Sequence, residues 1–218
     1  MYQNFHNQAN GRLKVWFAPH APYTCPPQYL EKIVAAAQDC HTGIHVHLAE
    51  TQDELRQIRE GYDKTPTEYL RDLGVFELPT LAAHGVYLTD SDVEILKAHQ
   101  VSIAHNPSSN LKLASGIADV AKYQQAGLNV ALGTDGASSN NSLDLFKEMT
   151  ICSFAQKVKT MDPTVLPAQT VLQMATINGA KALHWEDEIG TLEVGKKADI
   201  ILIDLDQPHF CTMEQHCS

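Results

Sequence analysis

The sequence has no run of basic residues, no CxxC pair of cysteines and no apolar stretch near the length of a membrane-spanning helix. Such a helix needs about 20 consecutive apolar residues. Nucleic acids and anionic membranes bind clusters of Lys and Arg, whereas this chain of 218 residues has a net charge of −10. We therefore expect an acidic, soluble protein with neither nucleic acid nor membrane as a partner.

Cysteine is also scarce, and its placement excludes two kinds of site. The five cysteines are scattered along the chain, at Cys25, Cys40, Cys152, Cys211 and Cys217. Their odd number and their spacing exclude a zinc knuckle and a disulfide framework. The first eleven residues are polar and lack the apolar core of a signal peptide. These features indicate a reducing compartment, and we expect the cytoplasm.

The chain does contain an alternation of short apolar segments and longer segments of helical period. Strands are predicted at Leu13–Ala18, Gly43–Leu48, Thr80–His84, Val101–His105 and Leu128–Leu132. Helices are predicted at Pro27–Asp39, Gln52–Glu60, Thr65–Leu73, Thr89–His99, Ile117–Ala126, Asn141–Thr160 and Pro167–Leu183. Alternation of this kind predicts an α/β fold with a parallel sheet covered on both faces.

The last part of the chain has a different pattern. Residues Ile189–Leu205 form a turn-rich, β-type run that is punctuated by Gly190 and Gly195. We therefore predict a boundary, with the α/β unit at residues 1–188 and a β-segment with a tail at residues 189–218.

Nearly every predicted strand ends in a polar residue able to do chemistry. These residues are His20, the group His45, His47 and Glu50, then His84, His105 with Asn106, and Asp135. In a parallel α/β barrel the carboxyl ends of the strands meet on one face, which carries the active site. Histidine and aspartate together suit a divalent cation such as zinc. The pattern therefore indicates a candidate metal hydrolase site.

Each of these residues also has a simpler interpretation. A lone histidine at a strand end is more often a hydrogen-bonded surface or core residue than a metal ligand. Asp135, in the sequence GTDG, could merely hold a turn, and Glu50 could lie on the polar start of a helix. Spacing alone leaves these alternatives open.

Several longer segments together resemble a known family. They are HVHLAE (45–50), HNPSSNLKLASG (105–116), GTDGASSNNSLDLFKEM (133–149), APHAPYTC (18–25), AAHGVYL (82–88) and the carboxy-terminal GTLEVGKKADIILIDL. This set resembles the amidohydrolase superfamily, and within it the 5-methylthioadenosine/S-adenosylhomocysteine deaminases. Triazine chlorohydrolases and guanine or cytosine deaminases share much of the pattern, so they remain alternative functions.

The resemblance implies a fold, a cofactor and an activity. The fold is a partial TIM-type (β/α) barrel covering roughly the last five strands, followed by a short segment of a small β-sandwich. The cofactor is a divalent metal, with zinc in first place and iron or manganese as alternatives. The activity is hydrolytic deamination of an adenine-bearing nucleoside with release of ammonia. The complete enzyme is expected to be a homo-oligomer.

The resemblance also implies residue roles. His47 and Asp135 would bind the metal, and Asp135 would also accept a proton from the attacking water. His84 would orient that water, and Glu50 would protonate the ring nitrogen next to the carbon under attack. His20 would contact the substrate, at its ribose. His105 and Asn106 are placed on the rim of the barrel without a chemical step.

One departure from the family is large. Members begin their barrel with a strand that carries two metal-binding histidines as His-x-His. The single pair at that spacing here is His45 and His47, and its neighbours match a later strand. We expect a truncated gene product, with a split barrel or a partner subunit that completes the site as alternatives. A fragment without catalytic activity is the competing functional interpretation.

Overall fold

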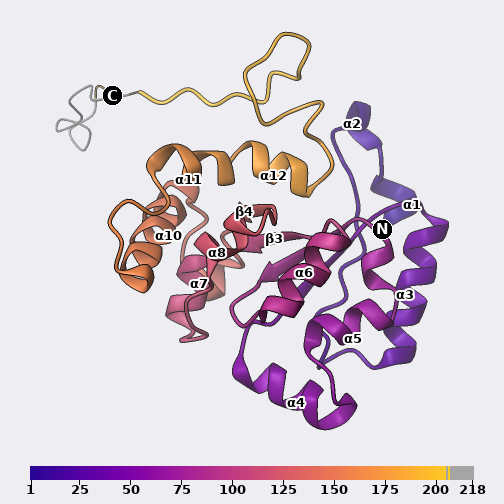
Figure 1. Cartoon of the computed structure of the whole chain (residues 1–218). Coiled ribbons are helices and arrows are strands. Elements are labelled where there is room, and N and C mark those ends of the chain that lie inside the picture. Colours follow the sequence, from indigo (N-terminus) through magenta and orange to yellow (C-terminus); the bar gives the residue numbers. More distant parts are fainter. Residues whose placement is uncertain (205, 207–218) are drawn as a thin grey trace.

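The computed structural model describes residues 1–204 and 206. Its centre is a four-stranded sheet in the order β1-β2-β3-β4 (Figure 1). The strands are β1 (Ile44–Leu48), β2 (Thr80–His84), β3 (Ser102–His105) and β4 (Val130–Leu132), and all neighbours are parallel. Helices connect each strand to the next, as parallel pairing requires. This arrangement confirms the predicted α/β fold with a parallel sheet.

The helices account for most of the remaining chain. Their bounds are α1 (Tyr2–Phe5), α2 (Gln8–Gly11), α3 (Pro27–Asp39), α4 (Gln52–Tyr62), α5 (Pro66–Asp72), the 3-10 helix η1 (Val75–Glu77), α6 (Asp90–Ala98), α7 (Pro107–Lys112), α8 (Val120–Gln125), α9 (Ala137–Asn140), α10 (Leu145–Thr160), α11 (Ala168–Met174) and α12 (Ile177–Ala182). None of the helices in the described ranges combines the length and the apolar character needed to cross a membrane.

The two faces of the sheet differ in what covers them. The register places Val46, Ala82, Ile103 and Val130 in one row, and all four are buried in the main hydrophobic core. Because side chains alternate along a strand, the neighbouring residues point to the other face. That face holds a smaller cluster around Leu81, Ala131 and Ala182. It also carries His45, which is exposed to solvent.

The first predicted strand is wrong in part. Residues Leu13–Ala18 contribute a single bridge, between Phe17 and Ile44, and form no regular strand. The amide of His45 donates to the carbonyl of Phe17, but the amide of His47 donates to that of His20. A continued parallel ladder would use Pro19, so one extra residue interrupts the pairing. The interruption places His20 beside β1.

Three differences in helical structure follow. The short helix α7 lies after His105, where no helix was predicted. The helix predicted at Asn141–Thr160 begins only at Leu145, because the Asp144 carboxylate accepts hydrogen bonds from the amides of Phe146 and Lys147. The helix predicted at Pro167–Leu183 is divided into α11 and α12 near Thr176, whose hydroxyl bonds to the carbonyl of Leu172.

The predicted β-segment has no strand among the residues that the structure describes. Residues 191–204 run away from the sheet (Figure 1), and Ile201 and Leu202 are 74% and 96% exposed. A β-strand needs a neighbour to bond its backbone. In the described ranges this run forms no ladder, and its Lys197 amide donates instead to the carbonyl of Glu188 in the preceding turn. Leu205 and residues 207–218, which complete the predicted segment and tail, lie outside the described residues.

Candidate active site

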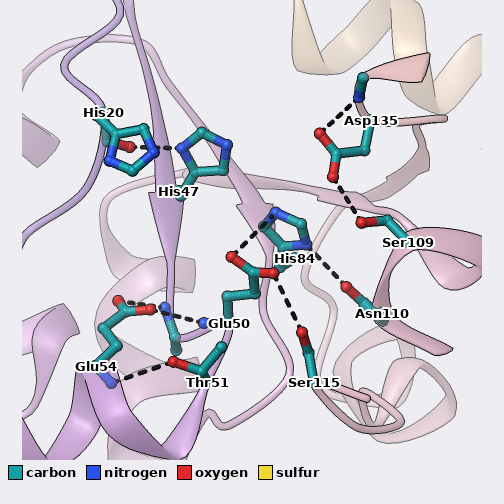
Figure 2. Close-up of polar contacts among 12 residues, drawn as sticks. His20, His47, Glu50, Thr51, Glu54, His84, Ser109, Asn110, Ser115 and Asp135 are labelled. Atoms are coloured by element: carbon teal, nitrogen blue, oxygen red, sulfur yellow. Dashed lines mark hydrogen bonds and ion pairs between the residues drawn. The ribbon is translucent and has the colours of Figure 1, made fainter. Parts of the chain in front are cut away.

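The polar residues predicted at the strand ends converge at the carboxyl edge of the sheet (Figure 2). A cleft of about 470 Å³ lies on the face of the sheet that carries His45 and Leu81, which we call the open face. It is lined by His20, His45, His47, Asn106 and Asp135, with apolar atoms from Leu81 and Ala83. Glu50 and His84 lie at the same edge. The structure thus brings together the histidines and carboxylates that were predicted to form one site.

His47 and His20 lie against each other at the entrance of this site. Their ring centroids are 4.9 Å apart, and the Nδ1 atom of His47 lies 2.6 Å from the carbonyl oxygen of His20. A carbonyl can only accept, so Nδ1 of His47 carries a proton, and Nε2 is the ring atom that faces away from this bond and can serve as a ligand. The Nδ1 atom of His20 lies 2.7 Å from the Thr24 hydroxyl.

His84 and Glu50 form the second pair. The Nε2 atom of His84 lies 3.7 Å from a carboxylate oxygen of Glu50, whose side chain is 20% exposed. The ring of His84 stacks on that of His47, with centroids 5.4 Å apart and planes 22° apart. Burial lowers the pKa of His84, although Glu50 and a hydrogen bond with Asn110 oppose the shift. His84 is therefore neutral near pH 7.

Asp135 lies across the site from these residues. One of its carboxylate oxygens accepts from the Ser109 hydroxyl at 2.6 Å, and the other accepts from the amide of Gly136 at 2.7 Å. Burial alone would raise the pKa of Asp135, but the two hydrogen bonds and the nearby imidazoles outweigh it and lower the pKa. Asp135 therefore remains a carboxylate at neutral pH, as a metal ligand must.

The backbone is strained at three points of this edge. Ala49, His84 and Asp135 have φ angles of 52°, 78° and 58°, in the left-handed region that residues other than glycine rarely adopt. Each such residue costs on the order of 1 kcal/mol or more and persists only when its surroundings hold it. Residues of this conformation also occur at turns elsewhere in the chain, but at these three positions they set the direction of the segments that carry the site residues.

The described residues fit part of a metal site. Among them, no three His, Cys, Asp or Glu side chains are close enough together to hold a metal ion. His47 and Asp135 nevertheless have suitable donors. Metal-binding histidines usually give their other ring N–H to a carbonyl or carboxylate, and His47 does so with His20. An imidazole nitrogen and a carboxylate are donors that zinc accepts.

Glu54 was not recognised from the sequence as part of the site. Its buried carboxylate accepts from the amides of Ala49 and Glu50, both at 2.8 Å, and so holds the turn that carries Glu50. Burial raises the pKa of Glu54 to about 7, against the effect of these bonds. The one hint of this role in the sequence was an acidic residue four positions after the HLAE segment. Acidic residues are common in the first turn of any helix, so the hint was not specific.

His105 and Asn106 lie deeper than expected. They are only 2% and 4% exposed, and neither ring nitrogen of His105 has a hydrogen-bond partner among the described residues. Burial lowers the pKa of His105 to about 3, so its ring is neutral. Asn106 lines the cleft, whereas His105 belongs to the packed layer beneath it.

Comparison with known proteins is consistent with this geometry. A 5-methylthioadenosine/S-adenosylhomocysteine deaminase of Caldanaerobacter subterraneus subsp. tengcongensis is 54% identical over 209 residues, covering 96% of this chain and 48% of that protein. The crystal structure of an adenosine deaminase from Xanthomonas campestris with bound zinc is 35% identical, with a TM-score of 0.90 over 97% of this chain and 48% of that one.

A guanine deaminase from C. acetobutylicum, solved with guanine bound in its active site, is more distant. It is 25% identical, with a TM-score of 0.82 over 89% of this chain and 47% of that structure. The chain therefore spans about half the length of the proteins it matches. Its sheet corresponds to part of a larger barrel, as the resemblance implied.

A model described as the amidohydrolase family matches residues 2–217, which is nearly the whole sequence. This match agrees with the residues gathered at the strand ends and with the similarity to the two deaminase structures. The chain belongs to the amidohydrolase family.

Proposed function

We propose that this chain carries one part of the active site of a metal-dependent hydrolytic deaminase that acts on adenine-bearing nucleosides of the 5-methylthioadenosine, S-adenosylhomocysteine or adenosine type. The observation that carries the proposal is the convergence of His47, Glu50, His84 and Asp135 at one edge of the sheet. The names of the similar proteins support the same chemistry. We also retain, as part of this proposal, the division of the chain into an α/β unit at residues 1–188 and a β-segment with a tail at residues 189–218.

The residues suit the individual steps. His47 and Asp135 would hold a divalent ion, zinc in first place, which when bound supplies hydroxide at neutral pH. Asp135, kept ionised by Ser109 and Gly136, would accept a proton from the attacking water and return it to the departing amino group. Glu50 would protonate the ring nitrogen beside the attacked carbon.

His84 and His20 would position the reactants. With a neutral ring, His84 can orient the attacking water beside Glu50. His20 lies at the mouth of the cleft next to His47, where it could contact the ribose. Two carboxylates thus take opposite roles, one as an acid and one as a base.

The test is complementation with the amino-terminal half of the Caldanaerobacter relative. The two polypeptides would be produced together, and zinc content and ammonia release from 5-methylthioadenosine, S-adenosylhomocysteine, adenosine, guanine and a triazine would be measured. We expect a zinc-containing pair that deaminates the adenine-bearing substrates and loses both properties with Asp135→Asn. Activity on guanine or the triazine alone would favour the alternative functions, and a stable pair without metal would reject the proposal.

A further inference from the structure

The start of α7, together with its N-cap Asn106, carries several polar residues that are almost completely buried. Asn106, Ser108, Ser109 and Asn110 are 4%, 6%, 0% and 1% exposed. A buried polar group without a hydrogen bond costs free energy, so such a turn is expected to have specific partners. The side chains of Ser109 and Asn110 have their partners in the candidate active site, whereas the Ser108 hydroxyl has none among the described residues.

One segment, residues 108–116, contacts the two carboxylates proposed to transfer protons and the histidine proposed to orient the water (Figure 2). The Ser109 hydroxyl donates to Asp135 at 2.6 Å. Asn110 Oδ1 lies 2.8 Å from Nδ1 of His84. The Ser115 hydroxyl donates to Glu50 at 3.1 Å.

The segment is held at both ends. At its start, the buried carboxylate of Glu148 accepts from the amide of Ser108 at 3.0 Å and from the side-chain amide of Asn140 at 2.8 Å. At its end, the Tyr87 hydroxyl donates to the carbonyl of Ser115 at 2.6 Å. Gly116 follows with a φ of +132°, and a Cβ there would lie 3.0 Å from the Tyr87 hydroxyl. These contacts leave the segment little freedom to shift.

The contact between Asn110 and His84 has a chemical consequence. An amide oxygen can only accept a hydrogen bond, so the bond requires a proton on Nδ1 of His84. In the neutral ring, Nε2 then has a lone pair and faces Glu50 at 3.7 Å. The other amide atom of Asn110, Nδ2, has no hydrogen-bond partner among the described residues.

We propose that Asn110 is a positioning residue that holds His84 in the Nδ1–H tautomer, while Ser109 and Ser115 of the same segment orient Asp135 and Glu50. In this tautomer His84 presents an acceptor to the reaction, so it can receive a hydrogen bond from the attacking water. The Nε2–H tautomer would present a donor to Glu50 instead. The part that Asn110 would play in catalysis rests on the proposed function. The tautomer of His84 does not depend on that function.

The test is ¹⁵N NMR of the histidine rings in the chain as it is, at neutral pH. Long-range ¹H–¹⁵N spectra distinguish the two neutral tautomers, and the signals of His84 among the 11 histidines are assigned by their loss in His84→Gln. The wild-type chain should show a protonated Nδ1 and an unprotonated Nε2. Asn110→Ala should shift the ratio of tautomers towards Nε2–H by roughly tenfold.

Two further variants separate positioning from packing. Asn110→Asp keeps an oxygen acceptor at the same place, so Nδ1 of His84 should stay protonated even if Asn110→Ala fails to fold. Leu111→Ala is the matched control, since Leu111 lies on the same helix but is 46% exposed, and it should leave the spectrum of His84 unchanged. An Nε2–H ring in the wild-type chain, or a tautomer ratio that is unchanged in a folded Asn110→Ala variant, would overturn the proposal.

The outcome is independent of the complementation experiment. An Nδ1–H ring that depends on Asn110 would stand even if the complemented pair deaminated no nucleoside. Conversely, an active pair with an Nε2–H ring would retain the proposed function and reject the role of Asn110.

Discussion

At the scale of single residues, Glu54 orders the turn that carries Glu50, but its carboxylate is buried, and burial destabilises the charged form. Its carboxylate fixes the turn of Ala49 and Glu50, yet its pKa in the folded chain is about 7, above its ordinary 4.5. A raised pKa means that the folded state binds the proton more tightly than the unfolded state. The resulting stabilisation is complete below about pH 4.5 and is lost as the pH rises through about 7.

We therefore predict that Glu54→Gln flattens the pH dependence of stability. Between pH 5 and pH 8 the free energy of unfolding of the wild type should fall relative to the variant, by an amount on the order of 3 kcal/mol. Urea unfolding at several pH values measures the difference. Glu60→Gln, at an exposed position of the same helix, is the control. Parallel pH profiles for the wild type and Glu54→Gln would show that Glu54 does not titrate in this range.

Glu50 gives a second prediction at this scale. In the complemented pair, Glu50→Gln should leave zinc bound, because Glu50 is not among the proposed ligands. Turnover should fall by roughly 10²- to 10⁴-fold, the usual contribution of a general acid or base. Zinc content and ammonia release, measured on the same preparation, test both statements. Loss of zinc in this variant would contradict the assignment of roles.

At the scale of elements, two helix starts are joined by one carboxylate. In the capping box of α6, Asp92 accepts from the amide of Thr89 at 2.9 Å, and the Thr89 side chain accepts from the amide of Asp92 at 3.1 Å. Asp92 also accepts from the hydroxyl of Thr65, the cap of α5, at 2.6 Å. Asp92 therefore stabilises the first turn of α6 and the start of α5 together.

Thr89→Ala should lower the free energy of unfolding by about 1 kcal/mol, the usual effect of removing a side-chain cap. For a domain of this size the corresponding fall in melting temperature is about 2–4 °C. Thermal unfolding followed by circular dichroism measures it. Glu94→Ala, at an exposed position within the same helix, should change the melting temperature much less. Equal effects of the two substitutions would show that the cap contributes nothing.

The elements also show where sequence patterns suffice. Strands β1 to β4 and helices α3 to α6 were predicted because apolar period and capping residues are local properties of the chain. The Leu13–Ala18 strand was wrong because its pairing depends on a non-local register, which is interrupted at Pro19. The predicted strand character of residues 189–205 also depends on backbone pairing with another segment, and the described residues of this run form no such ladder.

At the scale of the whole molecule, apolar side chains on the open face of the sheet remain accessible to solvent. The two tryptophans of the chain, Trp16 and Trp185, line a cleft of about 210 Å³ together with His45 and Leu81. An apolar face of this kind is expected to be covered when further strands complete the barrel.

Mixing the chain with the amino-terminal half of the Caldanaerobacter relative should therefore shift tryptophan fluorescence to shorter wavelength. Burial of the two indole rings is the physical reason. Any tryptophan in the amino-terminal half is first replaced by phenylalanine, so that the fluorescence comes from this chain alone. A Trp16→Phe, Trp185→Phe double variant should bind without the shift. Association without any change in the wild-type emission would show that the partner does not cover this face.

The candidate site was predictable as a set of residues but only partly as a structure. His47, Glu50, His84 and Asp135 follow from the family motifs and from the rule that parallel strands converge at their carboxyl ends. Glu54, Ser109 and Asn110 were missed as members of the site, because Ser, Asn and Glu near a helix start are equally common as caps. Their role depends on contacts between segments far apart in the chain, such as Asn110 with His84.

The hydrogen bonds that join α7 and the following loop with Asp135, His84 and Glu50 all lie within this one chain. The rotamers of these side chains are therefore ordered when the chain folds, before any second polypeptide or substrate arrives. Association then need not include the loss of side-chain entropy that an unstructured site would incur, on the order of 0.5–1.5 kcal/mol for each immobilised side chain. A barrel divided at this point would assemble from a preorganised half-site, and its binding affinity would benefit from that order.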